Sequence, residues 1–280
     1  MKKIIIYTAF IVSLLACRDG ALTGDSIIID DTTPQTEVDK WISSNVTNPY
    51  NIEVVYRWTD GETDLEKNLT PPEEDKVVGF MEVLKTLWID TYVEQAGADF
   101  LKELSPKQIL LIGSQNFNSD GSVTEGTAEG GRKIILYDVN GFDSHDASEV
   151  RSMIHVVHHE FAHIMHQTKD YSTDYDEITP EGYTTTWYNV EDSVAKQSGF
   201  ITPYAMLNTD EDFVEMVATF ITNSNAEWEA ILSGISNPEG VASLRKKEAI
   251  VADYFMTSWG IDIYDFQKLV SDEINRIVNE

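Results

Sequence analysis

Residues 155–167 read HVVHHEFAHIMHQ and contain five of the six histidines of the chain, counted with His155 and His166. Within it, His159, Glu160 and His163 form the pattern H-E-x-x-H. Helical residues four apart lie one above the other on one face, so both imidazoles can reach a single ion. Glu160 projects beside them and can take a proton from a metal-bound water. The stretch therefore predicts a metal-binding helix over about residues 148–167, with Zn²⁺ as the expected ion.

The flanking residues indicate that this helix is buried. A His-rich helix could also be a solvated surface element, but this one carries many apolar side chains: Val156, Val157, Phe161, Ala162, Ile164 and Met165. We expect Ala147 or Ser148 to cap its N-terminus, with Glu149 in the first turn.

The other histidines near the pattern do not complete the site. A catalytic zinc takes three protein ligands and a water. A metzincin would place its third histidine where this chain has Lys169, so that class is excluded. His166 shares a face with His159 and His163, but the three span about 10 Å of helix axis. We interpret His166 as packed, or as a partner of a ligand. His158 points about 100° away from His159 and receives no metal role.

The third ligand is expected from a downstream helix over residues 210–222, in which Glu211 and Glu215 share one face. In the gluzincin arrangement, such a helix supplies a glutamate ligand, and an acid one turn later holds a ligand histidine. We assign Glu211 as ligand and Glu215 as that partner; the reverse assignment and a solvated pair stay open. Tyr204 is a candidate hydrogen-bond donor to an oxyanion. Tyr183 is a weaker candidate for lining the cleft.

Composition narrows the function further. The chain has 280 residues, with 20 Lys and Arg against 48 Asp and Glu, and a net charge of −28 at pH 7. It lacks the basic clusters that bind phosphate, which argues against nucleic acid and against anionic lipid headgroups as surface ligands. Hydrophobic residues make up 42% of the chain, enough for the core of one large domain. A single cysteine excludes an intrachain disulfide and a Cys-rich zinc site.

The N-terminus reads as an export signal. Residues 1–17 are MKKIIIYTAFIVSLLAC, in which two lysines precede an apolar run that is too short to span a bilayer. The last four residues resemble a bacterial lipobox. We predict that residues 1–16 are a signal peptide, that Cys17 is lipidated, and that residues 17–36 are a flexible tether. Residues 37–280 then form the domain. An ordinary secretory signal is the alternative.

The remaining pattern places strands before helices, which is typical of an α+β domain. Strands are expected at residues 51–58, 108–113 and 132–139. A loop is expected throughout residues 116–131, which are rich in Gly, Asn, Ser and Thr. Helices are expected at residues 71–95, 100–104, 187–198, 210–224, 226–233, 239–257 and 262–278.

Three segments together resemble a known family: NPYNIEVVYRW at 48–58, TAEGG at 127–131 and HHEFAH at 158–163. The sequence is similar to a family of zinc-binding metallopeptidase lipoproteins of gut-type bacteria. The pattern around His163, Tyr204 and the E-x-F-x-E of residues 211–215 also resembles the catalytic domain of lethal-factor-type zinc metalloproteases. There, the first glutamate of E-x-F-x-E is a ligand and the tyrosine is catalytic.

The resemblance implies a zincin-like fold, in which a small twisted sheet packs on the active-site helix and the cleft faces C-terminal helices. Residues 132–139 would be the sheet edge that pairs with an extended peptide. The implied function is a zinc-dependent endopeptidase acting on a peptide or protein substrate. The alternative is a non-proteolytic binding or accessory lipoprotein of an outer-membrane uptake complex. Either would sit on the outer membrane, at the cell surface, through the lipid on Cys17.

Overall fold

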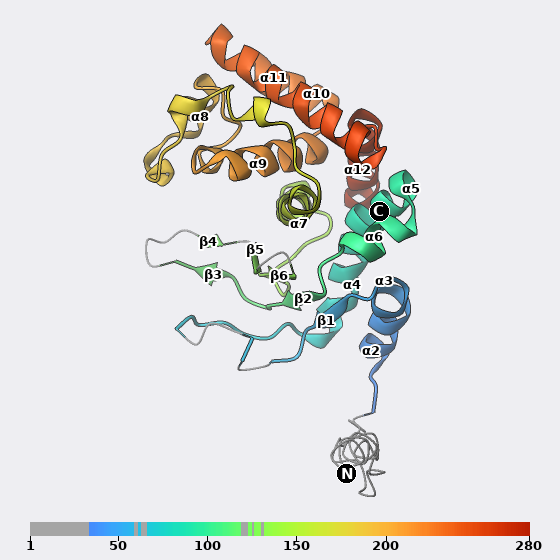
Figure 1. Ribbon diagram of the computed structural model, residues 1–280. Helices are drawn as coiled ribbons and strands as arrows, with labels where there is room; N and C mark the ends of the chain where they lie inside the picture. Colours follow the sequence, from blue (N-terminus) through green and yellow to red (C-terminus); the bar gives the residue numbers. More distant parts are fainter. Residues whose placement is uncertain (1–33, 59–60, 63–65, 119–122, 125, 130–131) are drawn as a thin grey trace, which may run out of the picture. The chain divides into compact units, whose positions relative to one another are not determined.

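A small mixed sheet forms one layer of the protein (Figure 1). The structure is a computed structural model that describes residues 34–58, 61–62, 66–118, 123–124, 126–129 and 132–280. In spatial order, the strands are β1 (Glu53–Val55), β2 (Gln108–Leu111), β6 (Lys133–Leu136) and β5 (Gly126–Glu129). The first three run parallel, and β5 pairs with β6 in the antiparallel direction.

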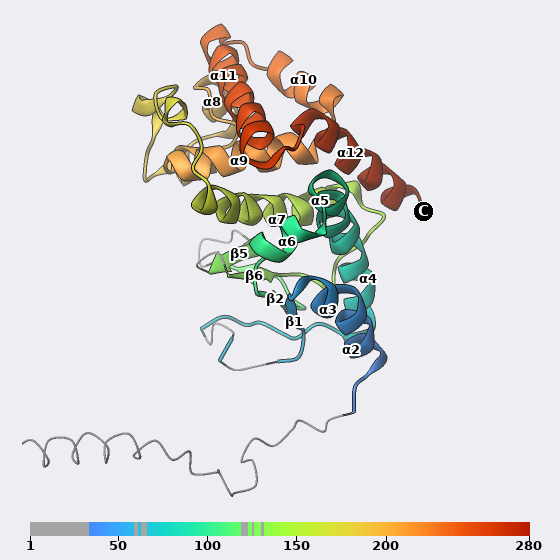
Figure 2. The same ribbon diagram turned by 45° about the vertical axis from the view of Figure 1, so that its right-hand side comes forward.

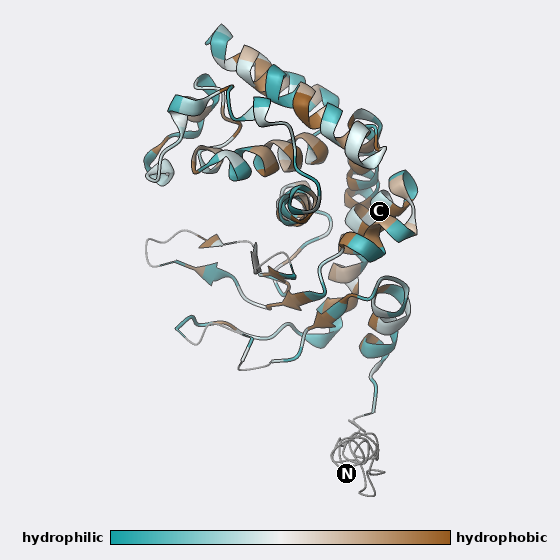
Figure 3. Cartoon of the chain, viewed as in Figure 1, coloured by the Kyte–Doolittle hydropathy of each residue, from teal (hydrophilic) through white to brown (hydrophobic). Residues whose placement is uncertain are grey.

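The two inner strands are apolar on both faces, as parallel strands covered on both sides usually are. Ile109 and Leu111 of β2 join the main core, whereas Leu110 packs on the opposite face with Ile112 and Ile135. Both β1 and β2 take the hydrophobic colour in Figure 3. The strands predicted at residues 51–58, 108–113 and 132–139 are therefore confirmed, each shorter than expected.

Two predictions about the sheet are wrong. Strand β6 lies between β2 and β5, so residues 132–139 are not at an edge; the edge strands are β1 and β5. Residues 116–131 are not loop throughout, because they contain β5 and a separate antiparallel pair, β3 (Asn116–Phe117) and β4 (Val123–Thr124). Gly, Asn and Ser have low strand propensity, but pairing with a buried neighbour strand overrides that preference.

A helical layer follows at one side of the sheet. Helix α4 (Glu74–Leu84) continues through a π-helical turn, Lys85–Asp90, into α5 (Thr91–Ala96), which confirms the helix predicted at 71–95. Gly97, with φ of 85°, ends it before α6 (Ala98–Leu104). Helical segments that the sequence pattern does not predict precede β1: α2 (Glu37–Ile42), a π-helical turn (Ser43–Thr47) and α3 (Asn48–Tyr50).

The helix that carries the histidines is α7 (Ala147–Thr168), in agreement with the predicted 148–167. It lies between the sheet and the C-terminal helices (Figure 1). The prediction of its N-cap is wrong by one or two residues. Asp146 is the cap, and its carboxylate accepts the backbone N–H groups of Ser148 and Glu149. An aspartate in this position also stabilises the positive end of the helix dipole.

Five helices build the C-terminal part (Figure 2): α8 (Asp192–Gln197), α9 (Thr209–Thr222), α10 (Asn225–Ser233), α11 (Pro238–Tyr254) and α12 (Ile263–Asn279). The last four confirm the predicted helices. The helix predicted at residues 187–198 is divided into a 3₁₀ turn, Trp187–Asn189, and α8. Helix α9 packs along α7, which brings its acidic residues against the histidines. The fold is α+β, as predicted.

The folded unit spans Thr36–Glu280. Among the described residues, no helix has both the length and the apolar character needed to cross a membrane. The predicted signal peptide, Cys17 and most of the predicted tether lie outside the described residues.

Candidate metal centre

Three histidines of α7 follow one another at four-residue intervals and lie along one face of the helix. His155 is partly exposed, whereas His159 is buried at 8% exposure. The rings of His159 and His163 lie 5.0 Å apart, centroid to centroid. The spacing that predicted a shared face for His159 and His163 therefore extends one turn toward the N-terminus, to His155.

Glu211, in the first turn of α9, faces two of these rings. Its Oε2 lies 3.2 Å from Nε2 of His159 and 3.4 Å from Nε2 of His163. Asn208 caps α9 and accepts the backbone N–H of Glu211, which fixes the start of the helix where the carboxylate is needed. These three side chains form a cluster with the geometry to hold a metal ion.

Glu215, one turn further along α9, contacts the same histidine from the other side. Its Oε1 lies 2.8 Å from Nδ1 of His159 and 3.0 Å from Nε2 of His155. Its Oε2 accepts a 2.7 Å hydrogen bond from the hydroxyl of Thr202. Both oxygens of this buried carboxylate are thus engaged by protein groups.

The donor set fits zinc on the Glu211 side. Zinc–ligand distances of 2.0–2.1 Å in a tetrahedron place neighbouring donor atoms about 3.3 Å apart. The separations of Glu211 from His159 and His163, 3.2 and 3.4 Å, match this value. The 2.8 Å contact of Glu215 with His159 is instead a hydrogen-bond distance. Because Nδ1 of His159 donates to Glu215, Nε2 is the ring nitrogen that faces Glu211 and would bind an ion in place of its proton.

The charges of the cluster reinforce one another. Burial lowers the pKa of His159, but hydrogen bonds to Glu211 and Glu215 outweigh it and raise the pKa to about 10. Burial likewise opposes ionisation of Glu211, yet the two histidines bring its pKa down to about 2. Burial also opposes ionisation of Glu215, but His155 and His159 outweigh it and hold its pKa well below the usual range. Both carboxylates are therefore anionic at neutral pH and suited to bind or orient a cation.

Tyr204 and Glu160 lie beside this cluster. The ring of Tyr204 stacks on that of His159 at 5.9 Å, and the ring of Trp187 meets Tyr204 edge-on at 4.9 Å. Burial, together with the charges of Glu211 and Glu160, raises the pKa of Tyr204 well above its usual range, so its hydroxyl keeps its proton. Glu160 also contributes to the raised pKa of His159, which places its charge close to the same centre.

The remaining histidines of α7 occupy different surroundings. Nε2 of His166 lies 3.1 Å from Nδ1 of His163, whereas the other ring nitrogen of His163, Nε2, faces Glu211. Burial lowers the pKa of His166. His158 is fully buried against Tyr92 and Phe266, and burial lowers its pKa to about 3. It lies away from the cluster, as its position on the helix predicted.

Tyr183 does not line the cluster. Its hydroxyl donates to the carboxylate of Asp212, which is fully buried and pairs at 2.5 Å with the equally buried Lys247 of α11. Lys247 also donates to the carbonyl of Gly199. Burial raises the pKa of Asp212 to about 6 despite the lysine. This pair joins α11 to the first turn of α9 and to the segment that leads to Tyr204.

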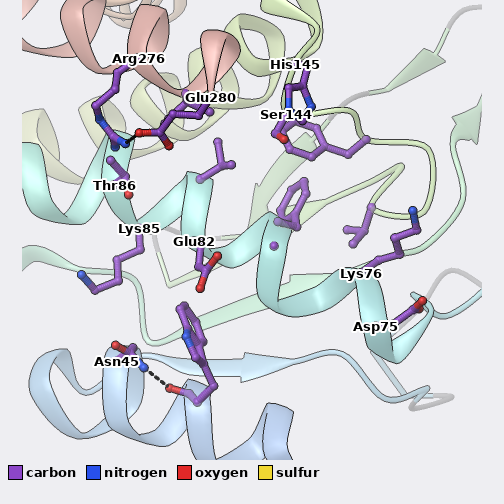
Figure 4. A pocket seen from close by; sticks show the side chains of 17 residues that line it. Asn45, Asp75, Lys76, Glu82, Lys85, Thr86, Ser144, His145, Arg276 and Glu280 are labelled. Atoms are coloured by element: carbon purple, nitrogen blue, oxygen red, sulfur yellow. Dashed lines mark hydrogen bonds and ion pairs between the residues drawn. The ribbon is translucent and has the colours of Figure 1, made fainter.

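A polar cavity of about 370 Å³ opens beside the cluster, with His163 and Glu211 in its wall. Acidic and uncharged side chains complete the lining: Gln167, Tyr171, Asp176, Asn208, Thr209 and Asp210. A second cavity, of about 580 Å³, involves neither histidine of the motif (Figure 4). It is lined by α4, the Arg276–Glu280 ion pair and the loop that holds Ser144 and His145.

The sequence pattern assigns no role to His155, Thr202 or Lys247. His155 carried a usable signal, because it precedes His159 by the same four residues that separate His159 from His163. Thr202 and Lys247 carried none, since their partners, Glu215 and Asp212, lie on a different element.

The fold and the donor set define a class: α+β proteins in which a histidine-bearing helix lies between a small sheet and a glutamate-bearing helix. The sequence profile of the family described as "Putative zinc-binding metallo-peptidase" matches residues 31–264, and the chain belongs to that family. A crystal structure of the same description, from Bacteroides caccae ATCC 43185, is 35% identical with a TM-score of 0.77, covering 88% of this chain and 97% of that chain. Among curated proteins, none matches.

Proposed function

We propose that this protein is a zinc-dependent metallopeptidase in which His159, His163 and Glu211 bind the metal. Within that class, we propose an endopeptidase. The observation that carries the proposal is the position of the Glu211 carboxylate, 3.2 and 3.4 Å from two Nε2 atoms of one helix face. Membership of a family named for zinc binding and peptidase activity supports it.

Glu211 is the better third ligand than Glu215. The Glu215 carboxylate already accepts from His155, His159 and Thr202, and its contact with His159 involves Nδ1. A histidine that donates one ring N–H to a carboxylate is held in the tautomer that presents its other nitrogen to a metal. We assign that orienting role to Glu215 for His159. His166 takes the equivalent place for His163.

The bound zinc would act as a Lewis acid and would lower the pKa of a coordinated water to about 7. Glu160 accepts the proton of the attacking water on its carboxylate and later delivers it to the leaving amine. Tyr204 keeps its phenolic proton and donates it in a hydrogen bond to the oxyanion that forms at the scissile carbonyl.

The edge strand β5 is the proposed docking strand for substrate. It packs so closely on α7 that a Cβ at Gly126 would meet Cγ1 of Val156 at 2.3 Å. Val156 precedes His159 by about one turn, so β5 runs next to the histidines. An extended peptide that adds to this edge by main-chain hydrogen bonds is brought alongside the metal ligands.

The test compares wild-type protein with Glu160→Gln, and with Glu103→Gln as a control at an exposed position on α6. Zinc content is measured by mass spectrometry and peptide cleavage with an unbiased peptide library. We expect one zinc per chain in all three proteins and loss of cleavage in Glu160→Gln alone. Equal cleavage by Glu160→Gln would contradict the mechanism. Zinc binding without cleavage by wild type would favour the non-proteolytic accessory protein.

We also propose, from the sequence alone, that the protein is exported and anchored in the bacterial outer membrane by a lipid on Cys17. The basic and apolar segments of residues 1–17 support this location. Exposure at the cell surface, within reach of an uptake complex, is part of the same proposal.

A further inference from the structure

The buried carboxylate of Glu215, which is only 5% exposed, accepts hydrogen bonds from three side chains in two segments of the chain. A carboxylate can only accept hydrogen bonds, so the three groups that contact it are donors. Two are ring nitrogens of α7, from His155 and His159, and both bond to Oε1. The third is the hydroxyl of Thr202, on Oε2.

Thr202 connects this carboxylate to the turn that carries Tyr204. Its hydroxyl donates to Glu215 at 2.7 Å and accepts the backbone N–H of Ala205 at 3.1 Å. In the sequence, Tyr204 lies between Thr202 and Ala205, and it begins the 3₁₀ turn Tyr204–Met206. The Thr202 side chain thereby ties the start of that turn to α9.

His155 is the second ring that donates to Oε1 of Glu215. Oε1 of Glu215 accepts hydrogen bonds from two imidazole rings that lie one helical turn apart on α7. These two hydrogen bonds restrict rotation of the carboxylate. Without His155, Oε1 would keep one donor, and the carboxylate could rotate away from the geometry that orients His159.

We propose that His155 and Thr202 are positioning residues that act through Glu215: His155 for the orientation of His159, and Thr202 for the placement of Tyr204. The catalytic half of this inference rests on the proposed peptidase function; the metal-binding half needs only a bound zinc. One buried carboxylate thus sets the relative positions of a metal ligand and the oxyanion donor, which are contributed by two different elements.

The metal-binding half is tested by zinc affinity alone. We expect His155→Leu to weaken zinc binding about 10–100-fold, the range found when partners of ligand histidines are removed. His155→Gln should restore most of it, because a glutamine amide can donate from a position close to that of Nε2. His145→Leu, at an exposed histidine outside the cluster, is the control. Unchanged zinc affinity in His155→Leu would overturn this half.

The catalytic half is tested by a double-mutant cycle. We expect Thr202→Val to lower kcat about 10-fold with KM and zinc content maintained, and Thr202→Ser to recover it. In a Tyr204→Phe background, Thr202→Val should have little further effect, because the two changes remove one function. Thr173→Val, at an exposed threonine, is the control. Equal effects of Thr202→Val in both backgrounds would overturn the assignment.

A readout without substrate separates this inference from the peptidase proposal. Fluorotyrosine at position 204 gives one fluorine NMR line whose shift and width report the placement of the ring. We expect Thr202→Val to shift or broaden that line and Thr202→Ser to leave it in place. If wild type cleaves no peptide but the line responds in this way, the peptidase proposal fails while the positioning role stands. An unchanged line in Thr202→Val would overturn the positioning role itself.

Discussion

Nδ1 of His159 lies 2.8 Å from Oε1 of Glu215, so the buried carboxylate fixes the orientation of the imidazole ring. Its opposite nitrogen, Nε2, consequently faces Glu211 at 3.2 Å. The two glutamates of α9 are one turn apart, and together they assign different roles to the two nitrogens of one histidine. This division of roles gives the first prediction.

Glu211→Ala should remove stoichiometric zinc, whereas Glu215→Ala should weaken zinc binding about 10–100-fold without abolishing it. The first change deletes a ligand, and the second deletes only the partner of a ligand. Metal content after dialysis and zinc titration would measure both, with Glu103→Ala as the control. The opposite ranking would make Glu215 the ligand.

Gly126→Val should lower the melting temperature by several degrees and impair peptide cleavage. The new side chain would meet Val156 on α7 and the carbonyl of Ile135, so β5 must move away from the helix. Thermal unfolding and kinetics would measure the two effects, and a second change, Val156→Ala, should relieve part of both. Gly79→Ala is the matched control, since a Cβ there has open space and alanine favours a helix. An unchanged melting temperature in Gly126→Val would contradict the close packing of β5 on α7.

Lys247→Met should destabilise the fold by about 3–5 kcal/mol, because it leaves the Asp212 charge buried without its partner. Adding Asp212→Asn should recover part of the loss by removing that charge. Denaturant unfolding gives the free energies, and Lys246→Met, at the exposed neighbouring position, should be near neutral. Similar unfolding free energies for Lys247→Met and Lys246→Met would contradict a structural role for the pair.

Asp39→Asn should lower the free energy of unfolding by about 1–2 kcal/mol at pH 7, and the difference should shrink in acid. The Arg57 guanidinium holds the pKa of Asp39 well below its usual range, assisted by Thr36 and Tyr56. A depressed folded-state pKa contributes stability that is present above the unfolded value, about 3.9, and is lost as pH falls below it. Unfolding at pH 7, 5 and 3 would measure this, with the exposed Asp99→Asn as the control. A difference independent of pH would exclude the ionised carboxylate as its source.

Cys17→Ser should abolish incorporation of labelled fatty acid and release the protein from the membrane fraction. The reason is that the sequence offers one cysteine, placed where a lipoprotein is acylated. Membrane association that persists in this variant would contradict a lipid anchor on Cys17.

The features that could be predicted from the amino-acid sequence are those that depend on local periodicity. The helix of His159 and His163, the pairing of Glu211 with Glu215 on one face, and four of the C-terminal helices follow from residues three and four apart. Side chains at that spacing share a face wherever the helix lies, so the pattern identified the candidate ligands before any packing was known.

The order of the strands in the sheet and the pairing of carboxylate oxygens with ring nitrogens depend on how the elements pack. Strand β5 is held by its pairing with β6, which overrides its own weak strand propensity. Glu215 meets His155, His159 and Thr202 because α9 packs along α7 in one register. Such contacts join residues 13 to 60 positions apart, and no periodicity within one element encodes them.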